Sequence, residues 1–456
     1  MSKRRYRRKN LPEQAVEISI TGISHEGRGI GHINGKVAFV DGALPNELIK
    51  AKYQRNRSQF SELKTLEVIK AASERVKPPC DYSEACGGCS LQHWQSGAQL
   101  SFKEDMLIDQ LNRIANIQSV DFEILPQLQA HTLGYRRKAR LAVRNVVKKG
   151  GVLIGFREKN SGFVMDMKGC EVLVEEVSCL LEPLRNLITS LDGLEEIPQI
   201  EVAVGELGPG KESGKIVALI LRHLKKLSET DLKCLLKFAE RFEVELYLQS
   251  GGMETVEKFF PSDDHERLYY YLPDYDLKMG FHPLDFTQIN GELNTMIIDL
   301  AIGLLDLDQA DLVLDLFCGL GNFTLPVARK AGAVVGIEGS CEMVERAREN
   351  AQNNAVVNAE FHAADLYKSF GQDSWLSKAY NKIILDPPRS GALEIIPFLL
   401  KMNPEKILYI SCNPATLARD TAELISGGYK LKSAGVMDMF PHTSHVESIA
   451  EFVLRK

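Results

Sequence analysis

Short alternating runs of apolar and polar residues fill the first part of the chain. Between residues 14 and 69, glycines and polar turn residues break these runs, and Asn34-Gly35 is a typical hairpin turn. Strict alternation places one face of each strand in a core and the other face in water. We therefore expect five short strands that close into a small OB-like β-barrel over residues 10–70.

The pattern changes twice further along the chain. Residues 93–112 have helical periodicity, and residues 135–270 alternate strand-like with helical runs, which predicts a central α+β domain over 71–274. From 275 to 456, buried-type strands alternate regularly with helical segments, which predicts a doubly wound, mainly parallel, Rossmann-like sheet. The strands expected in this sheet are 312–317, 334–338, 383–386 and 407–411.

The composition is that of an ordinary globular protein, with 44% hydrophobic and 25% charged residues. Charged residues interrupt each apolar stretch before it reaches the roughly 18 residues that a membrane span needs. The basic N-terminus is followed by Leu11-Pro12-Glu13 rather than by an apolar core, so it does not resemble a secretory signal. We expect a cytoplasmic protein with no membrane partner.

The formal net charge of -6 conceals a basic N-terminal region. Residues 1–70 contain 14 Lys or Arg and 7 Asp or Glu, whereas the rest of the chain is acidic overall. This segregation favours an N-terminal module that binds nucleic acid, although the basic residues at positions 3–9 taken alone also fit a solvated tail. Four further basic residues are expected on a connecting segment of the barrel: Lys50, Lys52, Arg55 and Arg57.

Three cysteines lie close together, where the chain has little apolar material. Cys80, Cys86 and Cys89 form the pattern C-x5-C-G-G-C, and Cys170 follows a turn-like Lys168-Gly169. In a reducing compartment such a cluster indicates a metal centre rather than disulfides. The alternatives are a zinc ion, an iron-sulfur cluster and no metal. Structural zinc sites usually combine two closely spaced ligand pairs, and only one such pair is present here, which modestly favours an iron-sulfur cluster. Four other cysteines have no such partners and are expected to be small buried side chains: Cys179, Cys234, Cys318 and Cys341.

Acidic residues follow the strands expected in the C-terminal domain. The first strand runs into the turn Gly319-x-Gly321, and Glu338 ends the second strand, where a carboxylate can bind a ribose diol. Asp365 and Asp386 end the next two apolar stretches. The missing third glycine argues against a dinucleotide, and the acidic residues favour the positively charged sulfonium of S-adenosylmethionine.

A thiol and a carboxylate are predicted at the same edge of this sheet. Cys412 comes directly after a strand, where it is either a nucleophile or an inert buried side chain. Glu447 precedes the last strand and is our candidate for a general base, with His442 and His445 as rivals.

These motifs resemble those of the RNA uracil-5-methyltransferase family over nearly the whole chain. FxQxN begins at Phe286 and is followed, in the family's order, by DLFCGxGNF, DPPR, SCNP and HVE. The N-terminal module resembles a TRAM domain, and the cysteine pattern resembles the 4Fe-4S ligand set of the ribosomal branch of that family. The similarity is greatest to the branch that methylates C5 of uracil-1939 in 23S ribosomal RNA.

The resemblance implies a role for each candidate residue. Cys412 would add to C6 of uracil and so make C5 nucleophilic, and Glu447 would then remove the C5 proton. The TRAM module and the basic tail would hold RNA phosphates while the target base is flipped out. The implied S-adenosylmethionine site consists of Gln288, Phe317, Asn322, Glu338, Asp365 and Asp386. The implied 4Fe-4S ligands are Cys80, Cys86, Cys89 and Cys170.

Three alternatives remain open. The first is the same chemistry on another or a second 23S ribosomal RNA uridine, or on a transfer RNA uridine. An amino-group methyltransferase is disfavoured because Arg389 follows Asp-Pro-Pro where a stacking aromatic is expected. A non-catalytic iron-sulfur RNA-binding redox sensor would leave the cofactor edge unexplained. We expect a structural role for the cluster, because methyl transfer needs no electron, and a monomer with no obligate protein partner.

Overall fold

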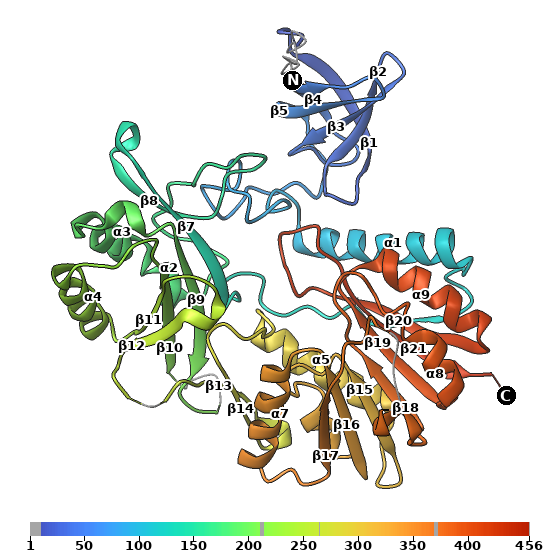
Figure 1. Cartoon of the computed structure of the whole chain (residues 1–456). Coiled ribbons are helices and arrows are strands. Elements are labelled where there is room, and N and C mark those ends of the chain that lie inside the picture. The colour runs from blue at the N-terminus through green and yellow to red at the C-terminus, as the bar shows by residue number, and fades with distance from the viewer. Residues whose placement is uncertain (1–10, 210–213, 264, 369–372, 456) are drawn as a thin grey trace, which may run out of the picture. The chain divides into compact units, whose positions relative to one another are not determined.

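The structure is a computed structural model that describes residues 11–209, 214–263, 265–368 and 373–455 (Figure 1). The chain divides into two compact units, here called unit 1 (Met1–Phe102 with His442–Ser444) and unit 2 (Lys103–Pro441 with His445–Lys456). The basic residues at positions 3–9 lie outside the described residues.

Unit 1 contains a closed barrel with strand order β1-β2-β3-β5-β4, shown in blue in Figure 1. Its strands are β1 (Val16–Ile23), β2 (Gly29–Ile33), β3 (Lys36–Asp41), β4 (Leu48–Asn56) and β5 (Phe60–Lys70). Asn34 and Gly35 both have positive φ, as the tight turn between β2 and β3 requires. The predicted five-stranded barrel is therefore confirmed.

The barrel core is narrow and consists of small and branched side chains. Ile18, Ala38, Val40 and Ile49 are almost completely buried, because alternate residues of each strand point inward. The same alternation corrects one expectation, since the basic residues expected on a connecting segment lie mostly on β4. Lys50, Lys52 and Arg55 are exposed on that strand, and Arg57 follows it.

The segment after the barrel is largely irregular, and one buried ion pair fixes it. Glu47 is buried, and its carboxylate accepts hydrogen bonds from the Arg75 guanidinium (2.7 Å) and from the backbone N–H of Leu44 (2.8 Å). Helix α1 (Ser96–Ala115) begins in this unit, close to where the sequence predicts it.

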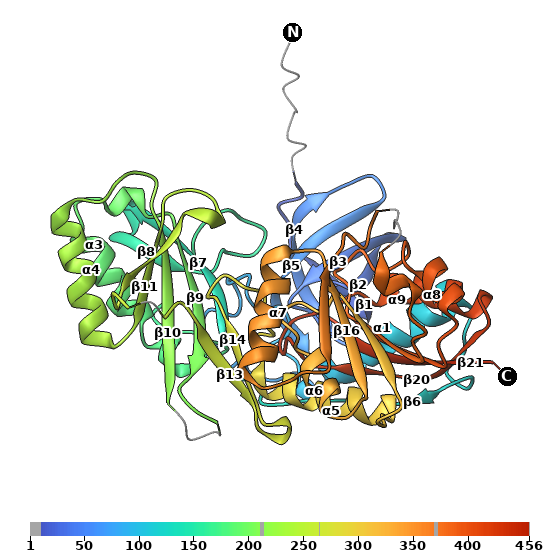
Figure 2. The ribbon, with the colours of Figure 1, turned by 60° about the horizontal axis from the view of Figure 1, so that its bottom comes forward.

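Unit 2 contains a mixed sheet of strand order β12-β11-β10-β9-β7-β8 and the β13-β14 hairpin. The strands are β7 (Lys138–Val146), β8 (Gly151–Gly155), β9 (Gln199–Glu206), β10 (Lys215–Arg222), β11 (Glu245–Gln249), β12 (Val256–Phe260), β13 (Leu268–Leu272) and β14 (Leu277–Phe281). The helices are α2 (Glu175–Ser178), α3 (Leu181–Ser190) and α4 (Glu229–Phe242). Figure 2 shows α3 and α4 beside this sheet.

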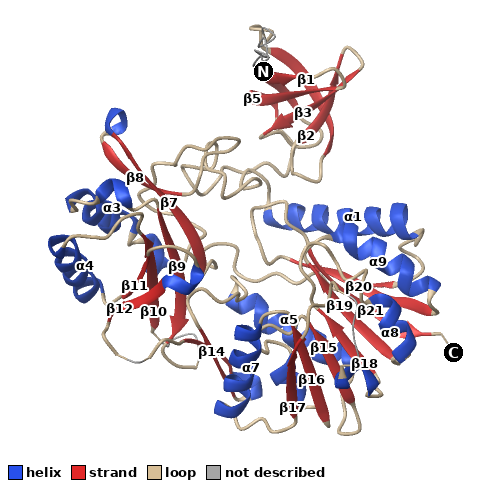
Figure 3. Ribbon diagram, in the orientation of Figure 1, coloured by secondary structure: helices blue, strands red, loops and turns tan. Residues whose placement is uncertain are grey.

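The C-terminal part of unit 2 is the predicted doubly wound sheet, with order β17-β16-β15-β18-β19-β21-β20-β6 (Figure 3). Its strands are β15 (Leu312–Leu316), β16 (Ala333–Glu338), β17 (Ala359–Ala363), β18 (Lys382–Leu385), β19 (Lys406–Ser411), β20 (Tyr429–Met437), β21 (Glu447–Leu454) and β6 (Glu123–Ile124). The helices that pack along it are α5 (Gly291–Leu305), α6 (Thr324–Ala328), α7 (Cys341–Asn353), α8 (Ile396–Met402) and α9 (Pro414–Ser426).

The topology of this sheet places a site at one edge. The first five strands in this order are parallel. β15, β16, β18 and β19 are buried along almost their whole length, as expected when helices cover both faces of a sheet, whereas the edge strand β17 buries only Phe361. The chain leaves β15 toward β16 and β17, and later continues through β18 and β19 on the other side of β15. Ligands bind beyond the carboxyl ends of the strands at such a switch point.

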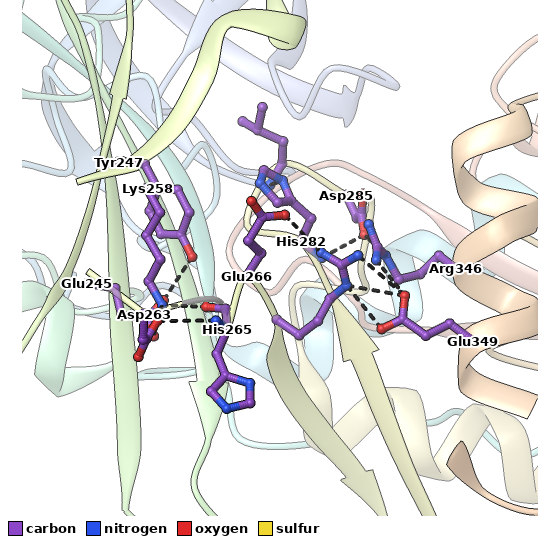
Figure 4. A network of polar contacts seen from close by, with 12 residues as sticks. Glu245, Tyr247, Lys258, Asp263, His265, Glu266, His282, Asp285, Arg346 and Glu349 are labelled. Atoms are coloured by element: carbon purple, nitrogen blue, oxygen red, sulfur yellow. Dashed lines mark hydrogen bonds and ion pairs between the residues drawn. The ribbon is translucent and has the colours of Figure 1, made fainter. Parts of the chain in front are cut away.

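Ion pairs connect the hairpin of unit 2 to the C-terminal sheet (Figure 4). The Arg346 guanidinium on α7 lies between Asp285 (3.0 Å) and Glu349 (2.9 Å), and Arg267 binds Glu349 (3.2 Å). Asp285 also accepts a hydrogen bond from the backbone N–H of His282 (2.7 Å). This network fixes the start of the loop that carries the FxQxN motif.

Two further observations bear on the expectations from sequence. Among the described residues, we find no helix of the length and apolarity that crossing a membrane would require.

Cys318 is buried as expected, but Cys179 and Cys341 are exposed and Cys234 is intermediate. The expectation for those three was wrong: Cys179 follows the short helix α2, and Cys234 and Cys341 lie on the amphipathic helices α4 and α7, so all three are at least partly exposed to solvent.

The close packing of the barrel strands predicts that alanine substitutions at two glycines change the stability of the barrel differently. A Cβ on Gly31 would lie 2.6 Å from the Ser19 carbonyl oxygen, whereas a Cβ on Gly22 meets nothing within 4 Å. We expect Gly31→Ala to lower the unfolding free energy by about 1–3 kcal/mol through overpacking. The matched control Gly22→Ala should leave it unchanged or slightly higher. Urea unfolding of the two variants checks this, and equal stabilities would contradict it.

Candidate active site

A cavity of about 610 Å³ lies at the carboxyl edge of the doubly wound sheet. Its walls come from the segments that follow β15, β16, β17, β18 and β19, from the loop that leads into β21, and from the FxQxN loop. Every residue that sequence analysis assigned to the cofactor or to catalysis lines this cavity: Gln288, Phe317, Asn322, Glu338, Asp365, Asp386, Cys412 and Glu447. The structure thus brings together residues from the whole C-terminal domain.

The turn after β15 has the backbone geometry of a ligand-binding loop. Phe317, Gly319 and Gly321 all have positive φ, which is unusual for a phenylalanine and is found mainly at functional sites. Backbone N–H groups of Phe317 and Cys318 both bond the Ile337 carbonyl oxygen (2.8 and 3.1 Å), which holds the strained turn against β16. The Phe317 ring lies 5.8 Å from the Tyr367 ring, so this side of the cavity is aromatic.

Glu338 is fixed at the end of β16. One carboxylate oxygen accepts the backbone N–H of Gly319 (3.1 Å) and the other accepts that of Ser340 (3.0 Å). Each oxygen retains a lone pair that can accept from a hydroxyl group of a ligand. Asp365 lies at the exposed rim, where an ion pair with Lys368 (2.7 Å) lowers its pKa.

Asn322 belongs to a polar network that the sequence did not reveal. Its amide exchanges two hydrogen bonds with the Asn294 amide (3.0 and 2.9 Å) and accepts one from the Tyr270 hydroxyl (2.8 Å). Asn294 is buried on α5, and a single amide on the apolar face of a helix is the one sequence signal that could have suggested it. These contacts leave one amide hydrogen of Asn322 for a ligand.

The cavity concentrates acidic groups away from water. Burial raises the pKa of Asp386 to about 7 and, with Asp386 nearby, that of Glu447 to about 8. Beneath them, Asp315 is fully buried and accepts a hydrogen bond from the Thr324 hydroxyl, and burial raises its pKa to about 7. Such a site favours a positively charged ligand, which would stabilise the ionised carboxylates.

Cys412 and Glu447 occupy neighbouring positions because of strand register. The antiparallel pair β19-β21 ends with Ser411 opposite Ser448, so the next position on each strand places Cys412 beside Glu447. Cys412 is half-buried, and burial together with the charge of Glu447 raises its thiol pKa to about 11. Arg389 opposes this increase and is the cation that favours the thiolate.

The two histidines that rivalled Glu447 have different surroundings. His445 lines the cavity in contact with the Arg389 guanidinium, and burial and Arg389 lower its pKa to about 4, which makes it a weak base. His442 belongs to unit 1, where its backbone and ring are bound by Gln99. Both observations favour Glu447 as the proton acceptor.

The predicted metal ligands are distributed over both units. Cys80, Cys86 and Cys89 lie in the irregular segment of unit 1, and Cys170 lies in unit 2. All four are buried. Within the part of the chain that the structure describes, no group of three or more His, Cys, Asp or Glu side chains is arranged to hold a metal ion. The structure does not show the predicted iron-sulfur centre.

A doubly wound sheet with a glycine turn after its first strand and acidic residues at the following strand ends defines a Rossmann-like methyltransferase domain. The model of the tRNA (Uracil-5-)-methyltransferase family matches residues 213–455, and the TRAM domain model matches residues 11–62. The chain belongs to the tRNA (uracil-5-)-methyltransferase family, with an N-terminal TRAM domain.

Curated relatives match along almost the whole chain. The 23S rRNA (uracil(1939)-C(5))-methyltransferase RlmD of Alcanivorax borkumensis is 47% identical over 446 residues, which are 98% of each chain. RlmD of Hahella chejuensis is 46% identical over 451 residues, 98% of this chain and 99% of the relative. The solved Pyrococcus abyssi tRNA (uracil-54, C5)-methyltransferase shares the fold, with a TM-score of 0.70 and 23% identity over 96% of this chain and 100% of its own.

The raised pKa of Cys412 predicts slow alkylation near neutral pH. Only the thiolate reacts with iodoacetamide, so a thiol with a pKa of about 11 should react slowly at about pH 8, and its rate should rise about tenfold per pH unit above that. Arg389→Leu should slow the reaction further, because it removes the cation that favours the thiolate. Mass spectrometry of labelled peptides measures the rates, with the exposed Cys341 as reference. A rate at Cys412 that does not change with pH would contradict this prediction.

Proposed function

We propose that this protein transfers the methyl group of S-adenosylmethionine to C5 of uracil-1939 in 23S ribosomal RNA. The observation that carries the proposal is the placement of Cys412 beside Glu447, in the same cavity as the glycine turn and the acidic strand ends. Relatives that are named for this activity and match 98% of the chain support the choice of substrate.

The cavity suits S-adenosylmethionine in shape and in charge. We assign Glu338 to a ribose diol, and the aromatic wall formed by Phe317 and Tyr367 to a nucleobase. Gln288, Asn322, Asp365 and Asp386 complete the lining that we assign to this ligand. When bound, S-adenosylmethionine supplies a methyl group made electrophilic by the positive sulfonium, a charge that the carboxylates of the cavity favour.

Cys412 begins the reaction by attacking the uracil ring. Its thiolate forms a bond to C6, the electrons of the C5=C6 double bond move toward O4, and C5 becomes nucleophilic enough to accept the methyl group. The Arg389 guanidinium, which lines the cavity, stabilises the thiolate before the attack. This addition forms a covalent bond between the protein and the RNA.

Glu447 ends the reaction by taking a proton. Its carboxylate removes the proton at C5, the freed electron pair restores the C5=C6 double bond, and the bond from C6 to Cys412 breaks to release the thiolate. A carboxylate whose pKa is about 8 is a much stronger base than an ordinary exposed one. Burial of Glu447 therefore serves the step that releases the product.

The N-terminal barrel supplies the features expected of an RNA-binding surface. Arg28 stacks over the Phe39 ring (5.0 Å), and the Phe39 ring meets that of Phe60 edge-on (5.7 Å). Aromatic faces stack on bases, and the exposed basic side chains of β4 can bind phosphates. We assign the barrel to RNA binding, which the flipping of a single uridine into the cavity requires.

We also propose that Cys80, Cys86, Cys89 and Cys170 hold a 4Fe-4S cluster with a structural role. The chemistry of these residues supports it, since all four thiols are buried and the Gly88 N–H donates to the Cys86 sulfur (3.4 Å), as amides do around iron-sulfur thiolates. Backbone hydrogen bonds to Gln92 and to Ser178 also fix Cys80 (3.2 Å) and Cys170 (2.8 Å). No step of the methyl transfer passes through the cluster.

A methyl-transfer assay tests the main proposal. Protein purified without oxygen should transfer labelled methyl groups from S-adenosylmethionine to unmodified 23S ribosomal RNA at one uridine. Cys412→Ala should abolish transfer because C5 is then not activated, and Cys341→Ala, which changes an exposed cysteine on α7, should not. Mapping of the labelled position identifies the uridine.

Each other outcome of this assay overturns a specific part of the proposal. A second labelled uridine would overturn single-site specificity, and label on transfer RNA would overturn the choice of ribosomal RNA. Full activity of Cys412→Ala would remove the nucleophile. Absence of label on both RNAs would favour a binding protein instead of an enzyme.

The cluster proposal has its own measurement. Anaerobically purified protein should contain iron and sulfide and absorb visible light, and Cys89→Ser should lose most of both because a thiolate ligand is gone. Cys234→Ser, at a cysteine outside the ligand set, is the matched control. Zinc in place of iron, or equal iron in both variants, would contradict the assignment.

A further inference from the structure

The loop between β20 and β21 carries His445 and leads directly into Glu447. A buried ion pair joins the first part of this loop to α1. The Lys103 ammonium donates to the Asp438 carboxylate (2.6 Å) and to the Phe440 carbonyl oxygen (3.1 Å). Lys103 and Asp438 are 0% and 1% exposed. Tyr135 adds a hydrogen bond to the carbonyl oxygen of Pro441 (3.2 Å).

The next part of the loop, His442–Ser444, belongs to unit 1 and is bound there. The Gln99 amide accepts the backbone N–H of His442 (3.0 Å), and its nitrogen lies 3.2 Å from the His442 ring. The same nitrogen donates to the carbonyl oxygens of Leu91 and Trp94 (3.0 and 2.8 Å). Backbone N–H groups of Ser90 and Leu91 both donate to the His442 carbonyl oxygen (2.9 Å each), and His442 itself has a left-handed φ of 65°.

Gln99 and Lys103 are one turn apart on α1, and burial of both is costly. Burying a charge or an amide loses its hydration, so such groups persist where their hydrogen bonds are complete and serve a purpose. In the reaction proposed above neither residue contacts a ligand. Their shared feature is that each binds a backbone group of the loop that precedes Glu447.

We infer that Gln99 and Lys103 are positioning residues for Glu447, and that they act on the release of the methylated RNA rather than on methyl transfer. This inference rests on the proposed function. Methyl transfer needs Cys412, which lies on another segment after β19, whereas proton removal needs the Glu447 carboxylate within reach of C5. A displacement of about 1 Å at such a group can cost a factor of about 100 in rate.

Lys103 has a second, electrostatic effect on the same carboxylate. The groups that act on Glu447 are Asp386, which raises its pKa, and Arg389 and Lys103, which lower it, and the neighbouring Cys412 thiol shares the site. Loss of Lys103 should therefore move the titration of Glu447 to higher pH. Gln99 is uncharged, so its loss should slow proton removal without moving the titration.

Trapping of the covalent adduct tests the inference. If proton removal is slow, the methylated RNA stays bonded to Cys412 and migrates with the protein on a denaturing gel. We expect Gln99→Met and Lys103→Met/Asp438→Asn to prolong the adduct about 10- to 100-fold in single turnovers, with little change in the rate of methyl transfer. In the Lys103 variant, the midpoint of adduct decay should also shift to higher pH. The second substitution there avoids leaving a lone buried carboxylate.

Matched controls separate positioning from general damage. Gln249→Met removes a buried amide on β11, and Lys382→Met/Asp311→Asn removes a buried ion pair (2.7 Å) at the amino edge of the sheet, so both should lose stability without accumulating adduct. Glu447→Gln should accumulate adduct strongly. If it does not, the base assignment of the proposed function fails. Two outcomes would overturn the positioning role while leaving the base assignment intact. In the first, Glu447→Gln accumulates adduct but neither the Gln99 nor the Lys103 variant does. In the second, the α1 variants slow methyl transfer and adduct release to the same extent.

Discussion

Removal of carboxylates from water at one edge of the sheet is the constraint on which the site depends. Parallel strands end together, so the acidic residues that follow them converge on one cavity, and the helices around the sheet keep water from screening their charges. Burial then makes ionisation costly, with the pKa of Asp315, Asp386 and Glu447 raised toward or above neutrality. The site is therefore electrostatically unfavourable for anions and favours a cation.

This constraint connects the ligand with the chemistry. A sulfonium in the cavity would favour the ionised form of nearby acids, including the Cys412 thiol, whose pKa burial and Glu447 raise. Arg389 contributes a fixed part of that charge, and together with burial it lowers the pKa of His445. Burial also raises the pKa of Glu447, which would make it the stronger base that the proposed proton removal needs.

The parts of this molecule that could be predicted from sequence are those fixed by neighbouring residues. The Asn34-Gly35 hairpin, the turn at Gly319 and the acidic strand ends follow from local pattern, and their meeting at one edge follows from parallel topology. Contacts between distant segments gave no such signal. Asn294 with Asn322, and Gln99 with His442, are pairs of ordinary polar residues whose meeting depends on the packing of whole elements. The solvent exposure of Cys179 and Cys341 was also misjudged, because it depends on how the nearby helix is oriented rather than on the local sequence.

The cysteine segment acquires a physical purpose from its place in the chain. Cys89 is followed directly by Ser90 and Leu91, whose N–H groups both bind the His442 carbonyl oxygen. A short irregular segment has little apolar material with which to hold two amides in a fixed direction, and a cluster bonded to Cys80, Cys86 and Cys89 would provide that rigidity without any electron transfer. If the proposed cluster is bound there, it would stiffen the segment whose Ser90 and Leu91 amides hold His442, to which Gln99 also binds, and so would steady the loop that leads into Glu447.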